Sequence, residues 1–305
     1  MGEGRLKVGL VWAGEPRKDD VKANSVDLRR SLTLAAFAVL ARVPNVAFYS
    51  LQKGEAGAQA KAPPPGMAIV DWTDELNDFA DTAALIEQLD LVITVDTSVG
   101  HVAGGLGKPV WVLSRFDACW RWLDNCEGSP WYPTMRLFYQ DEPGVWDAPL
   151  SRLTAALADV AARRAKTAAT VPVLLAAALA AHKAGRIQEA DAGYRRTLAL
   201  APGNGDGLHL LGLTALSGGR LDAAALLARA VRVESHRAAF HNSLGELHRT
   251  HHRFATAMAS LQRAAALDPG YAEARINLAK LLGAAGLRPA GQAVRLSPGL
   301  CDGWR

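Results

Sequence analysis

The feature that most constrains the fold of this chain is a 34-residue repeat in its second half. When the frame is restarted at Gly205, positions of the segment 171–204 recur: Gly185, Ala190, Tyr194 and Pro202 correspond to Gly219, Ala224, Ala228 and His236. A third copy begins at Ala238, one residue early, and a fourth at Ala272. Such a period predicts an array in which each repeat packs on its sequence neighbours and the stack buries one continuous core.

The recurring small, aromatic and proline residues resemble the tetratricopeptide repeat, which is a pair of helices. Two helices cross closely only where Gly or Ala removes side-chain bulk, and Pro stops the second helix. We therefore expect an all-α solenoid with repeats at 171–204, 205–237, 238–271 and 272–305. The last repeat is degenerate, because its second helix is interrupted by Pro289, Gly291, Pro298 and Gly299. The array would bind a protein or peptide in its groove, or serve as a spacer for its neighbour.

The first half of the chain alternates strand-like and helix-like segments. Apolar runs at 6–13, 46–51, 68–72, 91–95 and 110–113 are typical of buried strands, and helices are expected at 33–42, 81–89 and 98–106. This alternation predicts an α/β, Rossmann-like fold with a parallel, doubly wound sheet of five or six strands. We place this domain at 1–162 and a basic, Ala-rich linker at 163–170, before the repeats of 171–305.

Charge and composition separate the two halves and exclude several classes of function. Residues 1–165 carry 17 Lys and Arg against 21 Asp and Glu, whereas 166–305 carry 17 against 9. The Arg residues of the second half are scattered among Ala and Leu, which is typical of a solvated helix face, so we expect no nucleic acid partner. Three cysteines and the lack of a secretory apolar segment indicate a cytoplasmic protein, and no apolar run is long enough to predict a membrane span.

Candidate ligand-binding residues follow the predicted strands, because ligands of such sheets bind outside the carboxyl ends of the strands. Gly14 and Lys53 lie in two of these loops. Asp96 ends a strand, while Thr97 and Ser98 open a helix, which brings hydroxyls, unpaired amides and the positive end of the helix dipole together. This turn is suited to a diphosphate. The alternative is that the same residues only cap the helix.

An ordered series of motifs resembles the donor-binding lobe of bacterial glycosyltransferases that contain tetratricopeptide repeats, similar to the heptosyltransferases and, more distantly, to O-linked N-acetylglucosamine transferases. The motifs are VGLVWAG at 8–14, RSL at 30–32, SLQKG at 50–54, DFADTAA at 78–84, DTSVGH at 96–101 and SPWYP at 129–133. The resemblance implies the C-terminal lobe of a GT-B enzyme, a nucleotide-diphosphate sugar as donor, and no metal. It also implies that Asp96, Thr97 and His101 lie on the donor, with Ser98 at a position where heptosyltransferases have Gly.

Two further residues complete the predicted donor site. Arg30 is expected to pair with phosphate through its planar fork and Lys53 with ribose or pyrophosphate, although both would also suit solvated surface positions. His101, the only His of its domain, would contact phosphate or sugar, or else pack as a core residue.

The resemblance places the catalytic base in an N-terminal lobe that we do not find in this chain, so no catalytic residue is assigned. Either the chain is a fragment or the lobe acts with a partner. The sequence therefore predicts a glycosyltransferase donor lobe joined to an interaction array. The alternative function is a tetratricopeptide scaffold with a vestigial, inactive lobe.

Overall fold

The structure is a computed structural model, which describes residues 4–117, 120–122 and 126–284. The chain divides into two compact units, residues 1–168 and 169–305, and we describe each by itself. The second helix expected for the fourth repeat, with its Pro and Gly residues, lies outside the described residues.

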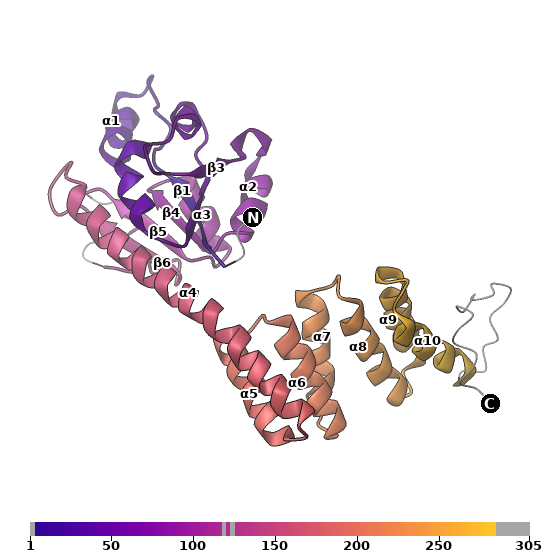
Figure 1. Cartoon of the computed structure of the whole chain (residues 1–305). Helices are drawn as coiled ribbons and strands as arrows, with labels where there is room; N and C mark the ends of the chain where they lie inside the picture. Colours follow the sequence, from indigo (N-terminus) through magenta and orange to yellow (C-terminus); the bar gives the residue numbers. More distant parts are fainter. Residues whose placement is uncertain (1–3, 118–119, 123–125, 285–305) are drawn as a thin grey trace. The chain divides into compact units, whose positions relative to one another are not determined.

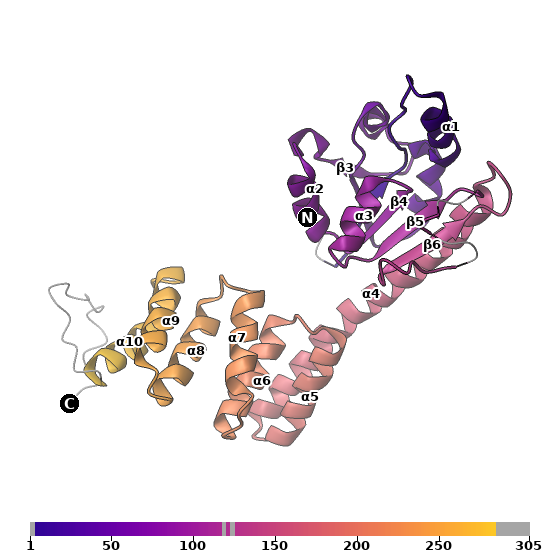
Figure 2. The same ribbon diagram turned by 180° about the vertical axis from the view of Figure 1, so that it is seen from behind.

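The first unit is built on a six-stranded sheet in which all neighbouring strands are parallel. The strand order is β3-β2-β1-β4-β5-β6, so the direction of winding reverses between β1 and β4, at the centre of the sheet (Figures 1 and 2). Their bounds are β1 Leu6–Val11, β2 Val46–Ser50, β3 Ile69–Asp71, β4 Leu91–Val95, β5 Val110–Ser114 and β6 Met135–Tyr139. This arrangement confirms the predicted parallel α/β sheet, and its order is that of doubly wound folds.

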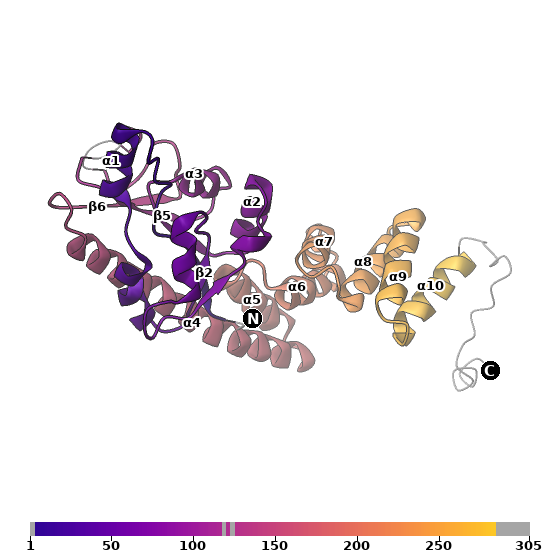
Figure 3. The same ribbon diagram turned by 90° about the horizontal axis from the view of Figure 1, so that it is seen from above.

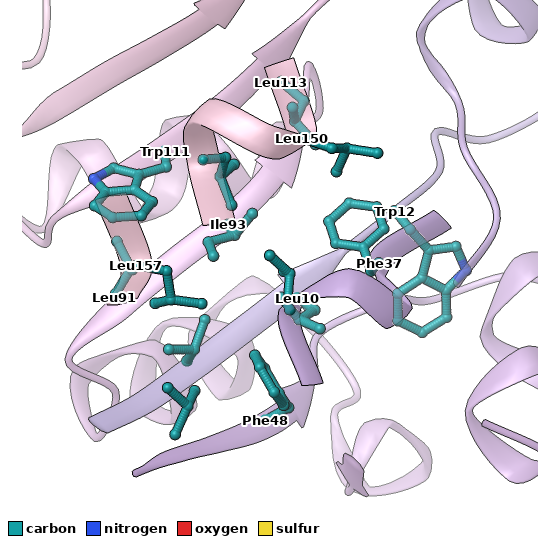
Figure 4. Close-up of a cluster of buried hydrophobic side chains, with 14 of the residues drawn as sticks. Leu10, Trp12, Phe37, Phe48, Leu91, Ile93, Trp111, Leu113, Leu150 and Leu157 are labelled. Atoms are coloured by element: carbon teal, nitrogen blue, oxygen red, sulfur yellow. The ribbon is translucent and has the colours of Figure 1, made fainter. Parts of the chain in front are cut away.

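Each face of the sheet is covered by its own helices. On one face, Phe37 of the 3₁₀ segment η1 (Leu34–Arg42) and Leu150 of α4 (Asp147–Lys183) pack with Leu10 and Ile93 of the sheet (Figure 4). On the other face, α2 (Phe79–Glu87) and α3 (Ser98–Gly105) pack on β4 and β5 through a second buried cluster. Strands buried on both faces explain why β4 and β5 appear in the sequence as unbroken apolar runs.

Several elements differ from those expected. The helix α1 (Val21–Arg30), two short 3₁₀ segments, η2 (Glu55–Lys61) and η3 (Thr73–Glu75), and strand β6 were not predicted. Arg30 therefore ends a helix instead of preceding one. The helix expected to open at Asp81 begins at Phe79, because Asp78 accepts hydrogen bonds from the amides of Ala80 and Asp81 and is its N-cap.

The segment 163–170, expected as a linker, is helical and belongs to α4. Its alanines have the highest helix propensity of any residue, which explains a helix where a basic, Ala-rich composition suggested a connection. The division between the two units falls within this segment. Among the described residues, α4 is also the one helix that could cross a membrane by length and composition alone. Its Leu153 and Leu157 are fully buried in the core of the first unit.

The second unit is a series of helix pairs, in which the end of α4 is followed by helices that alternate in direction (Figure 3). These helices are α5 Ile187–Leu200, α6 Gly205–Ser217, α7 Ala223–Val233, α8 Ala238–Thr250, α9 Phe254–Leu267 and α10 Ala272–Ala284. Small residues lie where paired helices cross. A Cβ added to Gly193 would come within 2.6 Å of the Cβ of Ala178, and one added to Gly245 within 2.7 Å of Leu261.

Burial corrects the alignment of the second repeat by one residue. The buried positions that match Ala190 and Tyr194 are Ala223 and Leu227, whereas Ala224 is only partly buried. Ala224 and Ala228 therefore match Ala190 and Tyr194 by the 34-residue spacing, but they do not occupy the same buried positions of the helix. The helical solenoid itself is as predicted.

Candidate functional site

A cleft of about 360 Å³ opens at the carboxyl ends of β1, β2 and β4, on the edge of the sheet where the winding reverses. Loops after all three strands and the first turns of α2 and α3 contribute to its wall. The lining residues are Val11, Ala13, Gly14, Glu15, Arg17, Arg30, Leu51, Gln52, Lys53, Phe79, Thr82, Thr97, Ser98 and Val99. Five of the seven predicted site residues are therefore brought together: Gly14, Arg30, Lys53, Thr97 and Ser98.

Arg30 is held in a fixed orientation at this cleft. Its Nε and Nη2 donate to Oδ1 of Asp27 at 3.0 and 2.9 Å, and its Nη1 donates to the carbonyl of Asp96 at 2.7 Å. Asp27 is 4% exposed and Arg30 retains a partly exposed side chain. Within the described residues, three of the five guanidinium N–H groups are engaged, which leaves two for a ligand in the cleft.

Gly14 owes its place to this ion pair. A Cβ at Gly14 would overlap the Asp27 carboxylate and the Arg30 guanidinium, so no larger residue fits while the pair is in place. Its amide donates to Oγ of Ser31 at 2.9 Å, and that hydroxyl lies 3.1 Å from Oδ2 of Asp27. Gly14 thus lets the chain after β1 approach Arg30 closely.

The turn from β4 to α3 presents the start of a helix to the cleft. Thr97 occupies the N-cap position, but its side chain makes no capping bond and its Oγ1 lies 2.9 Å from Oγ1 of Thr94 instead. Ser98, the first residue of α3, is exposed. Because the first amides of a helix have no intrahelical partner and carry the positive end of its dipole, this turn favours an anion. Asp96 contributes its backbone carbonyl, which orients Arg30.

Lys53 lines the cleft, but its charge is engaged by the protein. Its Nζ donates to the carbonyls of Thr73 and Leu76 at 2.6 and 2.7 Å. These bonds tie the loop after β2 to the η3 segment after β3. In this arrangement, the ammonium group of Lys53 connects two loops of the protein through hydrogen bonds instead of being free to bind a ligand.

His101 is not among the residues that line the cleft. Its ring stacks on Trp122 with a centroid separation of 5.0 Å, and its Nδ1 lies 3.1 Å from the hydroxyl of Tyr132. Burial lowers the pKa of His101, against the opposing effect of the Asp96 charge. The aromatic residues after β5 thus hold His101 as a packed, half-buried side chain, the alternative that the sequence left open.

Gln52 and Asp27 were missed as contributors to this edge of the sheet. Gln52 is 3% exposed, and its Oε1 accepts from the amides of Trp12 and Ala13 at 2.9 and 2.8 Å, while its Nε2 donates to the carbonyl of Ala13 at 3.0 Å. The side chain locks the end of β1 to the end of β2. The sequence signal that could have identified Gln52 is its position, since it is a polar residue that closely follows a buried strand.

The lining of the cleft is mixed in charge but rich in donors. Its charged residues are Arg17, Arg30, Lys53 and Glu15, and Thr97 and Ser98 line the same space. The arrangement can hold an anionic group between the guanidinium of Arg30 and the start of α3.

Comparison with known proteins gives partial matches. No family model matches the chain. Protein FlbA of Caulobacter vibrioides is 30% identical over 160 residues, which are 51% of this chain and 26% of that protein. The chain therefore spans about a quarter of the length of the curated relative it matches.

Two solved structures are similar to part of the chain. A mutant O-GlcNAc transferase of Thermobaculum terrenum shares 34% identity with a TM-score of 0.37, over 38% of this chain and 22% of the other. The first tetratricopeptide domain of Spaghetti (RPAP3), bound to an HSP90 peptide, shares 19% identity with a TM-score of 0.37, over 38% of this chain and 93% of the other. For the second unit, the 34-residue period and the paired helices identify a tetratricopeptide-type array.

Proposed function

We propose that the cleft of the α/β unit binds the diphosphate of a nucleotide sugar, and that this unit is the donor-binding part of a glycosyltransferase. The observation that carries the proposal is the geometry of Arg30, which Asp27 and the Asp96 carbonyl hold beside the uncapped start of α3. Guanidinium groups and helix N-termini both bind phosphate groups in many proteins.

In this proposal, the diphosphate lies between Arg30 and the first amides of α3, with the hydroxyls of Thr97 and Ser98 at its oxygens. Gly14 leaves room for the Asp27–Arg30 pair that orients the guanidinium. The same groups would stabilise the charge that develops on the departing diphosphate during sugar transfer, without a metal. The catalytic base and the acceptor site are not assigned to residues of this chain.

The repeat array is proposed to bind a protein or peptide. Residues 166–305 carry 17 basic against 9 acidic residues, so an acidic segment fits the array better than a basic one. A transferase lobe and an interaction array in one chain would bring the donor to a bound protein partner.

The decisive experiment places a charge at the start of α3. Ser98→Asp should preserve or slightly raise stability, because a carboxylate at a helix N-terminus is favourable by about 0.3–1 kcal/mol. It should weaken binding of UDP, ADP or GDP roughly tenfold or more, since the carboxylate repels the diphosphate. Ser98→Asn is the neutral control, and titration calorimetry on the full chain measures the affinities.

A second pair of variants tests Arg30. Arg30→Lys keeps the charge but loses the fork, and should weaken nucleotide binding about tenfold. Arg42→Met, at the end of η1 and outside the cleft lining, is the matched control. Saturable binding that survives both Ser98→Asp and Arg30→Lys would refute the site.

The second candidate function is a tetratricopeptide scaffold whose α/β unit has lost donor binding. It is favoured by the positions of Lys53 and His101, whose polar groups are engaged within the protein. If none of the three nucleotides binds saturably, while the chain is folded, this function replaces the first.

A further inference from the structure

In the part of the chain that the structure describes, three buried nitrogen donors without a hydrogen-bond partner belong to residues that directly follow β5 and β6. They are Nε and Nη1 of Arg115 and Nε2 of Gln140. Ser114 pairs with Tyr139 in the parallel register, so Arg115 and Gln140, the next residues along, follow at the same level of two neighbouring strands. Paired residues of parallel strands point to the same face, and adjacent strands lie about 4.8 Å apart, so the register continued by one residue puts Arg115 and Gln140 on one face of the sheet, one strand apart.

The amide of Gln140 is oriented by its other end. Its Oε1 accepts a hydrogen bond of 2.9 Å from the amide of Phe116, the residue after Arg115. Gln140 is 5% exposed. Because the carbonyl oxygen is thus committed to the backbone, Nε2 is left as a buried donor, and an unsatisfied buried donor is costly.

The charge of Arg115 is only partly compensated. Its side chain is 12% exposed, and its Nε lies 3.5 Å from Oδ1 of Asp117, too far for a hydrogen bond. The same carboxylate forms an ion pair with Arg29. Two guanidinium groups therefore share one carboxylate, which lies on the surface with Arg29, so the more deeply buried charge of Arg115 is only partly compensated.

We propose that Arg115 and Gln140 form an anion-binding site for a single phosphate or carboxylate group. The unpartnered atoms are all donors, so they match an oxyanion and not a cation. A buried water could satisfy the N–H groups but would leave the shared charge uncompensated. The site is separate from the cleft, whose lining includes neither residue, and it does not depend on the proposed function.

The test uses the full chain carrying Ser98→Asp, so that any anion binding at the start of α3 is weakened. Inorganic phosphate and acetate are titrated separately, and the Arg115 Nε–H resonance is followed by NMR on protein labelled in arginine. The resonance should shift saturably with at least one of the two anions, and the anion that shifts it identifies the source of the oxyanion. Arg115→Gln and Gln140→Leu should each weaken that binding roughly tenfold or more.

Asp117→Asn keeps the test independent of folding defects in the other variants. It removes the competing carboxylate, so binding should tighten about threefold or more, whereas a purely structural Arg115 would show no change in affinity. Arg136→Gln on β6, whose side chain pairs with Glu127, is the matched control and should leave binding unchanged. An Arg115 resonance that does not move with either anion overturns the proposal, as does affinity that is unaltered by Arg115→Gln, Gln140→Leu and Asp117→Asn.

Discussion

At the scale of single residues, Gly14 is a position of the cleft where a single added carbon, the Cβ, would overlap neighbouring side chains. We expect Gly14→Ala to destabilise the protein by about 1–3 kcal/mol, because its Cβ must displace the buried Asp27–Arg30 pair. Urea unfolding followed by tryptophan fluorescence measures the change, since seven of the eight Trp residues precede residue 165.

Gly105 provides the control for this substitution. A Cβ added there, at the end of α3, meets nothing within 4 Å. Gly105→Ala should therefore be neutral or stabilising by up to about 1 kcal/mol. Equal losses for the two variants would mean that the contact with Asp27 and Arg30 is not the cause.

His252 is a residue in a conformation that favours glycine. Its φ is 56°, and the matching turns of the two earlier repeats hold Gly185 and Gly219 with φ of 74° and 68°. His252→Gly should stabilise the repeat unit by about 0.5–1 kcal/mol, because the left-handed region costs a side chain about 1–2 kcal/mol and glycine loses part of that gain through its unfolded-state entropy. Thermal unfolding followed by far-UV circular dichroism checks it, and Gly219→Ala should change stability in the opposite direction.

At the scale of elements, His209 links two helices and makes their packing sensitive to pH. Its Nε2 on α6 lies 2.8 Å from Oγ of Ser243 on α8, and its ring contacts Phe240 at a centroid distance of 4.7 Å. Burial lowers the pKa of His209, with Asp206 opposing and Arg237 adding to the shift. In the unfolded chain the pKa of His209 has its ordinary value near 6.5. As pH falls, the unfolded chain therefore binds the proton before the folded chain does.

It follows that the stabilising contribution of neutral His209 is complete above pH 6.5 and is lost as pH falls from there toward the folded pKa. We expect stability to fall by up to about 1.4 kcal/mol per pH unit over that window. Urea unfolding between pH 5 and 8 should show a shallower slope for His209→Gln. His236→Gln changes an exposed side chain and should leave the slope as it is; a wild-type slope in His209→Gln would contradict the assignment.

The elements that the sequence predicts are those whose burial follows a simple period. Strand β4 is found at the expected residues because both of its faces are buried, which leaves an unbroken apolar run. Helix α1 was missed because Val21 and Leu28 are exposed and only Asp27 is buried, so no apolar stripe marks it. Strand β6 was missed because the exposed Arg136, its second residue, interrupts the apolar run of this edge strand.

The candidate site divides in the same way. Their positions directly after predicted strands were enough to predict that Gly14, Thr97 and Ser98 lie in one cleft. The reason is that the carboxyl ends of parallel strands share one edge of the sheet. The partners of Lys53 and His101 could not be foreseen. They come from η3 and from the residues after β5, whose approach depends on tertiary packing and on no local pattern.

At the scale of the whole molecule, two units with separate cores share one helix. The sheet of the first unit is enclosed by two buried clusters, and the second unit has its own small clusters between successive repeats. The division at Ala168 lies inside α4, so that helix contributes to both. Separate cores predict that each unit unfolds in its own transition, with a ligand acting on the unit that binds it.

Nucleotide binding should therefore stabilise the α/β unit selectively. At a free nucleotide concentration about 100 times Kd, the unfolding free energy of that unit should rise by about 2.7 kcal/mol. Tryptophan fluorescence reports this unit, and amide hydrogen exchange in α6 to α9 reports the repeats. We expect the unfolding of the α/β unit to shift and the exchange of the repeats to stay the same, with Ser98→Asp lowering the shift to about 1.4 kcal/mol or less at the same nucleotide concentration. Equal added protection in α6 to α9 would instead show that the two units unfold as one cooperative body through α4.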